Sequence, residues 1–126
     1  MIGATSGIEK SVKCTAAVAA FTIAKPGADD DTFSTAAAAT DLCVGVFQHA
    51  TSAAGEEVRL MLTGVSRVKT GGAITRGNLV TADASGYGVA CAPGAGTNNY
   101  SIGIAMATAA SGDIIPVLLA PTRPQG

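Results

Sequence analysis

The sequence predicts a mainly β fold, a small glycine-rich β-barrel or sandwich, and three observations lead to this prediction. The 16 glycines, together with clusters of Pro, Asn and Asp, break the 126 residues into short segments that suit strands better than helices. Several of these segments alternate apolar and polar residues, as half-buried strands do. A strand-loop-strand pattern also occurs twice, which predicts an internally duplicated unit.

The composition predicts a folded domain with a thin core. Leu, Ile, Val and Phe together number 27, and Ala alone contributes 25. A formal net charge of −1 is too small for a disordered chain, because disorder requires high net charge as well as low hydrophobicity. Charged residues make up only 13%, against roughly 25% in soluble proteins. We therefore expect other chains to cover much of the surface; the alternative is a monomer with an alanine-rich, weakly charged surface.

The first forty residues contain one clear strand pattern. The segment IEKSVKC places four residues on one face of a strand, namely Ile8, Lys10, Val12 and Cys14. The apolar run AAVAAFTIA at residues 16–24 is interpreted as a second strand rather than as a signal peptide. The segment STAAAATD at residues 34–41 is too short for more than one turn of helix.

The duplicated pattern joins residues 44–62, VGVFQHATSAAGEEVRLML, to residues 102–119, IGIAMATAASGDIIPVLL. Gly45 aligns with Gly103 and Gly55 with Gly112, with one residue fewer in the second copy. Each copy is predicted to form a strand, an Ala-rich loop and a second strand. In this alignment Val44, Val46, Val58 and Leu60 take places equivalent to Ile102, Ile104, Ile115 and Val117.

Two such hairpins must cover each other or share a sheet, because an isolated strand pair is barely stable in water. Residues 63–93 supply further strands, with glycines where a small barrel bends. We expect residues 1–41 to form an N-terminal arm and the first strands, and residues 42–126 to form the duplicated β domain. The two parts together are interpreted as one structural domain.

No group of residues is predicted to carry out catalysis or to hold a metal or cofactor. His49, the single histidine, has no Ser, Cys or carboxylate pattern beside it that indicates a catalytic triad. Asp29–Asp31 lack the spacing of a calcium loop and are interpreted as a solvated turn or helix cap. Glu56 and Glu57 are neighbours on a strand and point to opposite faces, and PGAGTNN at residues 93–99 lacks the Lys-Ser or Lys-Thr of a phosphate loop.

The remaining residue types indicate which partners to exclude. Cys14, Cys43 and Cys91 are odd in number and widely spaced, so we expect three free, buried thiols in a reducing compartment, without a bound metal. The eight basic residues are scattered and no Trp is present, which argues against nucleic-acid binding. No apolar run approaches the roughly 20 residues of a membrane span.

Two alternatives come from other functional classes. A carrier domain of the lipoyl or biotinyl type is also a small glycine-rich β structure, and it presents a modified lysine at a hairpin tip. Lys69 in RVKTGG lies near a turn, although its flanks differ from those of such carriers. An unidentified enzyme is the second alternative.

The duplicated segments and the residues that join them, GGAITRGNLVTADASGYGVA, resemble the capsid decoration, or cement, proteins of tailed bacteriophages. The resemblance covers residues 42–121 and rests on the aliphatic strand that follows each copy and on the spacing of Gly45, Gly55, Gly72, Gly77, Gly103 and Gly112. It implies a structural virion protein, made in the host cytoplasm, that sits on the outside of a phage head. It also implies that the major capsid protein is the partner, that the protein is commonly a homotrimer and that it needs no cofactor.

The N-terminal segment MIGATSGIEKSVKC has the character of an arm that orders on contact with the capsid. An arm of this kind adds itself to an exposed sheet edge, and Ile2, Ile8 and Val12 would then fill side-chain pockets of the capsid protein. The alternative is that this strand completes the protein's own sheet. In that case the binding surface is expected on the loops of the repeat, around residues 53–56 and 110–113.

Overall fold

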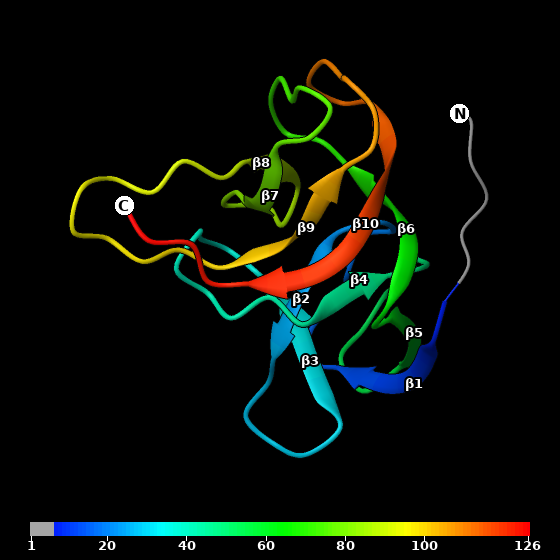
Figure 1. The fold of residues 1–126 in the computed structure, drawn as a ribbon. Coiled ribbons are helices and arrows are strands. Elements are labelled where there is room, and N and C mark those ends of the chain that lie inside the picture. The colour runs from blue at the N-terminus through cyan, green and yellow to red at the C-terminus, as the bar shows by residue number, and fades with distance from the viewer. Residues whose placement is uncertain (1–6) are drawn as a thin grey trace.

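The structure, a computed structural model, describes residues 7–126, and these form two five-stranded sheets placed one above the other (Figure 1). The first sheet contains β1 (Glu9–Cys14), β2 (Ile23–Pro26), β3 (Thr32–Thr35), β4 (Gly45–Phe47) and β5 (Glu57–Met61). The second contains β6 (Gly64–Lys69), β7 (Leu79–Ala82), β8 (Gly88–Ala90), β9 (Ser101–Ala105) and β10 (Ile114–Thr122). This architecture confirms the predicted mainly β class. None of residues 7–126 belongs to a helix that is long and apolar enough to cross a membrane.

The first sheet is a closed barrel with the strand order β1-β3-β2-β4-β5. It closes because β5 pairs antiparallel with β1, while β1 also runs parallel to β3. Alternate side chains of these strands point into the barrel, where their burial stabilises it by removing apolar surface from water. The interior residues are Val12, Cys14, Val18, Ala24, Phe47, Val58 and Leu60.

The second sheet, with the order β6-β10-β9-β7-β8, repeats the pairings of the first. The pair β6–β10 corresponds to β1–β5, β9–β10 to β4–β5, β7–β9 to β2–β4 and β7–β8 to β2–β3. Even the parallel contact recurs, as Cys14 opposite Phe33 and as an isolated bridge between Thr70 and Gly88. The duplication therefore extends beyond the predicted hairpins to the five strands of each half. We call the two halves the first and second barrels because of this correspondence, but only the first is closed: the second is a five-stranded sheet in which the isolated Thr70–Gly88 bridge stands in place of the β1–β3 pairing.

The predicted alignment of the two hairpins agrees with the register of both pairs. Val46 lies opposite Met61 in the first barrel, and Ile104 lies opposite Leu118 in the second. The loops also end alike, because the Gly55 N–H donates to the Cys14 carbonyl and the Gly112 N–H donates to the Thr70 carbonyl, each at 2.8 Å. Gly55 and Gly112 have φ angles of 86° and 91°, a left-handed conformation that glycine adopts without steric cost.

The outer side of the first barrel packs against the interior of the second sheet. Ile23, Val46 and Met61 belong to one apolar cluster with second-barrel core residues such as Val80 and Ile102. Three hydrogen bonds also join the two barrels. Gln48 Nε2 donates to Ser66 Oγ at 2.9 Å, the Lys69 N–H donates to the Phe21 carbonyl at 2.9 Å, and the Ile23 N–H donates to the Gly86 carbonyl at 2.8 Å. The two barrels thus share a core.

Of the two expectations for residues 16–24 and 34–41, the structure corrects the first and agrees with the second. Residues 16–22 are not a strand, because β2 begins only at Ile23 and Phe21 has a left-handed φ of 63°. Residues 38–41 form a turn closed by the hydrogen bond from the Asp41 N–H to the Ala38 carbonyl, in agreement with the expected single turn. The predicted division of the chain after residue 41 falls between β3 and β4 of the first barrel.

Candidate binding surface

Four strands of the second barrel carry a row of outward-facing apolar side chains. Leu118 in β10 lies opposite Val65 in β6 on one side and opposite Ile104 in β9 on the other. Ile104 in turn lies opposite Leu79 in β7. Because directly opposite residues point to the same face of a sheet, these four side chains form a continuous stripe across it.

Three more apolar residues extend this stripe toward the β9–β10 loop. Met106 follows β9, and its N–H donates to the Pro116 carbonyl at 3.0 Å, which continues the ladder. Ile114 and Pro116 alternate with Leu118 along β10 and therefore share its face. Ile104, Ile114, Leu118 and Met106 are 37%, 38%, 40% and 47% exposed. We call the seven residues Val65, Leu79, Ile104, Met106, Ile114, Pro116 and Leu118 the outer apolar face.

The first barrel has an equivalent row, but that row is covered. Leu79, Ile104 and Leu118 correspond by register to Ile23, Val46 and Met61. These three first-barrel residues are at most 3% exposed, because the second barrel packs on them. The same position in the fold is thus a buried interface in one barrel and an open surface in the other.

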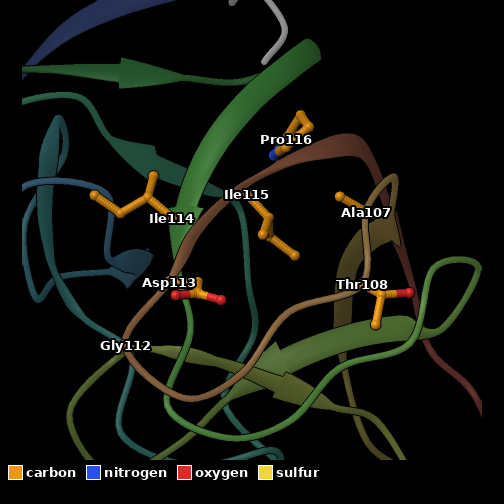
Figure 2. Close-up of a pocket in the computed structure, with 7 residues that line it drawn as sticks. All are labelled: Ala107, Thr108, Gly112, Asp113, Ile114, Ile115 and Pro116. Carbon is orange, nitrogen blue, oxygen red and sulfur yellow. The ribbon is translucent and has the colours of Figure 1, made fainter. Parts of the chain in front are cut away.

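An open pocket adjoins the outer apolar face at the β9–β10 loop (Figure 2). Its volume is about 480 Å³, and its lining residues are Ala107, Thr108, Gly112, Asp113, Ile114, Ile115 and Pro116. Figure 2 shows Ala107 and Thr108 across the opening from β10, with the side chain of Ile115 between them. Most of the lining is apolar, which suits an apolar group of a partner.

Hydrogen bonds from Thr70, the residue after β6, and within the loop hold one wall of the pocket. Thr70 Oγ1 donates to the carbonyls of Ala110 and Asp113, and the Asp113 carboxylate accepts the Ala110 N–H at 3.0 Å. The first barrel has a matching arrangement, in which the Glu56 carboxylate accepts hydrogen bonds from Ser52 that lower the pKa of Glu56. Residues 110–113 are one of the two loops expected to bind if the arm does not, and two of them, Gly112 and Asp113, line the pocket.

The structure describes two of the three residues predicted for the arm. Ile2 lies outside the described residues. Ile8 is 62% exposed, and its carbonyl accepts the Leu62 N–H at 2.8 Å. The expectation that Val12 fills a pocket of the capsid protein is corrected, because its side chain is 2% exposed in the core of the first barrel. There, β1 completes the protein's own sheet.

The predicted glycines serve as turns and as points of close approach. Gly45 and Gly103 hold equivalent places in β4 and β9, and a side chain on either would meet the carbonyl oxygen of the strand beside it, from Met61 and Leu118. The left-handed turn positions are Gly55, Gly77 and Gly112. Gly72 has only an ordinary contact, with Val89.

The polar residues that were examined as candidate catalytic or metal-binding groups make hydrogen bonds and ion pairs within the fold. The Arg59 N–H donates to His49 Nε2 at 3.2 Å, and His49 Nδ1 donates to the Ala50 carbonyl at 3.2 Å. Asp29–Asp31 lie in the β2–β3 turn, where Asp31 pairs with Lys10 at 2.6 Å. Among residues 7–126, no three His, Cys, Asp or Glu side chains are grouped so that they could hold a metal ion.

Lys69 does not have the position of a carrier lysine, and the three cysteines are buried or half-buried. Lys69 ends β6, opposite Ile114, and its ammonium group lies 5.2 Å from the centre of the Tyr87 ring, so it is not at a hairpin tip as the carrier alternative requires. Cys14 and Cys43 are buried, Cys91 is half-buried, and all three are free. Burial raises the pKa of the Cys43 thiol to about 11, with smaller contributions from Asp41 and Cys91.

The outer apolar face could not be predicted from the sequence pattern. Both hairpins have apolar residues on both sides of their second strand, in RLML and in IIPVLL. That pattern indicates a strand buried on both faces. It does not reveal which of the two outer faces the other barrel covers, since this depends on how the barrels pack.

Comparisons with known proteins identify a family and, separately, a similar fold. The model of the family described as phage cement protein matches residues 4–119. Among solved structures, the chain is similar to the head fiber gp8.5 N base of bacteriophage phi29, with a TM-score of 0.70 and 19% identity over 90% of this chain and 93% of that chain. At this identity the similarity shows the fold alone. No curated relative matches the chain.

Proposed function

The chain belongs to the phage cement protein family, and from this membership we propose that it binds the major capsid protein on the outer surface of a phage head and strengthens the shell. As a member of this family it is a structural virion protein associated with the capsid. Its proposed role is mechanical rather than catalytic: it holds neighbouring capsid subunits together against the pressure of the packaged DNA.

The outer apolar face is the observation that supports attachment through the second barrel. It brings together four of the six large apolar side chains that are exposed among the described residues. An exposed, contiguous apolar surface is typical of a protein–protein interface, because its burial removes that surface from water. The low charge of the chain is compatible with the same role, since few charged groups would lose their hydration on contact.

We propose further that the protein is a homotrimer when attached to the shell. The thin core and the weakly charged, alanine-rich surface support association with other chains. A trimer that touches several capsid subunits gains from avidity, because effective concentrations for tethered sites reach about millimolar. Contacts that are weak one by one would then give lasting attachment.

Co-sedimentation with phage heads that lack the protein tests this function. The wild-type chain is expected to pellet with expanded heads, and Leu118→Asp is expected to bind about tenfold more weakly or worse, because a carboxylate in the middle of the apolar face must lose its hydration. Leu42→Asp is the matched control, since Leu42 is 47% exposed but lies outside the face. Its binding should stay near that of the wild type.

A thermal melt of each variant in the absence of heads checks that the barrels still fold. Failure of the folded wild-type chain to pellet with any form of the head would refute the proposed function. Equal losses in Leu118→Asp and Leu42→Asp would refute the assignment of the surface.

A further inference from the structure

The side chain of His49 occupies, in the first barrel, the place where the second barrel has its pocket. Gln48 and Met106 are equivalent, because the Gln48 N–H donates to the Arg59 carbonyl just as the Met106 N–H donates to the Pro116 carbonyl. His49 is therefore equivalent to Ala107. Its imidazole bonds to the Arg59 N–H and so covers the gap between the loop and β5.

The second barrel lacks both the donor and the acceptor of this hydrogen bond. Ala107 has only a methyl group where the first barrel has an imidazole, and Pro116 has no N–H to offer in place of that of Arg59. Both residues instead line the pocket of about 480 Å³ (Figure 2). The first barrel supplies its own side chain at this point, and the second leaves the space open beside the outer apolar face.

We propose that this pocket receives an apolar side chain of the major capsid protein, which takes the place that His49 fills in the first barrel. The inference rests on the proposed function and specifies its contact. Ile115 and Pro116 provide apolar walls for this side chain. The capsid segment that carries it lies along the outer apolar face on β9 and β10.

A capsid protein fits this site better than a second copy of the chain does. Outside the outer apolar face, the large exposed apolar side chains among residues 7–126 are Ile8 and Leu42. They lie on separate elements, in a segment before β1 and in the β3–β4 connection. Two copies could pair their outer apolar faces only in a two-fold dimer, whereas a trimer requires a different, matching surface on the second copy. Residues 7–126 offer no other apolar surface of that extent, and a member of this family associates with a capsid.

Closing the pocket with the residues of the first barrel tests this proposal. In the variant Ala107→His, the second barrel carries an imidazole at the place equivalent to His49, and the outer apolar face is unchanged. We expect binding to heads, measured by co-sedimentation, to weaken about tenfold or more. The double variant Ala107→His with Pro116→Arg also restores the N–H to which the imidazole bonds in the first barrel. Because Pro116→Arg adds a charge to the outer apolar face, this double variant is compared with the single variant Pro116→Arg.

The matched control is His49→Ala, which opens the equivalent gap in the first barrel and should leave binding to heads unchanged. Normal occupancy by a folded, pocket-filled variant would overturn the pocket proposal while the proposed function stands. Absence of binding by the wild-type chain itself would overturn both. If the wild-type chain self-associates in solution without heads and the pocket-filled variant does not, as measured by light scattering, the occupant is a second copy. That result would overturn the assignment to the capsid protein.

Discussion

At the scale of single residues, the two barrels impose the same requirement on Gly45 and Gly103. Each lies where the neighbouring strand of its hairpin approaches so closely that a Cβ atom would meet a backbone carbonyl oxygen. Backbone cannot rotate away as a side chain can, so the strands themselves would have to separate. This explains why the two copies share a glycine within a strand, at the start of β4 and in the middle of β9, although glycine otherwise weakens a strand.

Gly103→Ala is accordingly expected to destabilise the protein by about 2 kcal/mol or more, because overpacking in a well-packed core has costs of this order. Gly72→Ala is the control, since a Cβ there has its nearest neighbour at 3.5 Å, an ordinary contact. We expect its effect to stay within about 0.5 kcal/mol. Urea unfolding of both variants measures the difference, and equal stabilities would contradict the explanation.

A second residue-scale prediction concerns Cys43. Burial, with help from Asp41 and Cys91, raises the pKa of this thiol from 9.0 to about 11 in the folded protein. A raised pKa means that the folded state prefers the protonated thiol, so its contribution to stability is complete below pH 9 and is lost as the pH rises toward 11. Cys43→Ala should therefore reduce the fall of the unfolding free energy over this range, measured by urea titration at several pH values. The same fall in wild type and variant would show that Cys43 does not contribute.

At the scale of elements, the sequence predicted the two hairpins because their glycines, loop lengths and aliphatic strands are alike in both copies. The equivalence of β1 with β6 could not be predicted in this way. Their matching positions hold Val12 and Val68, but also Cys14 and, directly after β6, Thr70. The sulfur bonds to carbonyls of the β4–β5 loop and the hydroxyl to carbonyls of the β9–β10 loop, so different residue types make the same contact and the sequence similarity is lost.

The outer apolar face escaped prediction for a related reason. Val46 and Ile104 are similar residues at equivalent places, yet one is fully buried and the other is 37% exposed. The difference comes from the packing of one barrel on the other, which involves contacts distant in sequence such as that between Gln48 and Ser66. A periodic pattern records which side of a strand is apolar, but not what covers it.

The third prediction separates the N-terminal arm from the outer apolar face as the attachment site. Deleting residues 1–7 leaves β1 and its pairing with β5 intact, so the melting temperature should change little. We expect the shortened chain to decorate heads at normal occupancy in a co-sedimentation assay, because the face lies on the second barrel. A folded but non-binding truncation would assign attachment to the arm, with Ile2 as its candidate contact.

At the scale of the whole molecule, the second barrel covers the outer side of the first. The equivalent outer side of the second barrel stays open. This asymmetry gives a duplicated chain one distinct face, so the two halves need not perform the same role. The first barrel contributes its outer side to the shared core. The second barrel is then available for a partner.

The fourth prediction is that the protein forms trimers, at least on the shell. Multi-angle light scattering over a range of concentrations measures the state in solution, and quantitative gel analysis of purified heads gives the copies per capsid site. Monomers in solution would mean that trimerisation depends on the shell. One copy per attachment site on the assembled particle would contradict the trimer.

The most direct test of the central claim is a cryo-electron microscopy reconstruction of phage heads decorated with this protein. Our account predicts density for both barrels on the outer surface of the shell, with the outer apolar face turned toward the capsid protein and the pocket beside Ala107 and Pro116 filled by a capsid side chain. A reconstruction in which the strands β9 and β10 face solvent, while another surface of the chain contacts the shell, would contradict it.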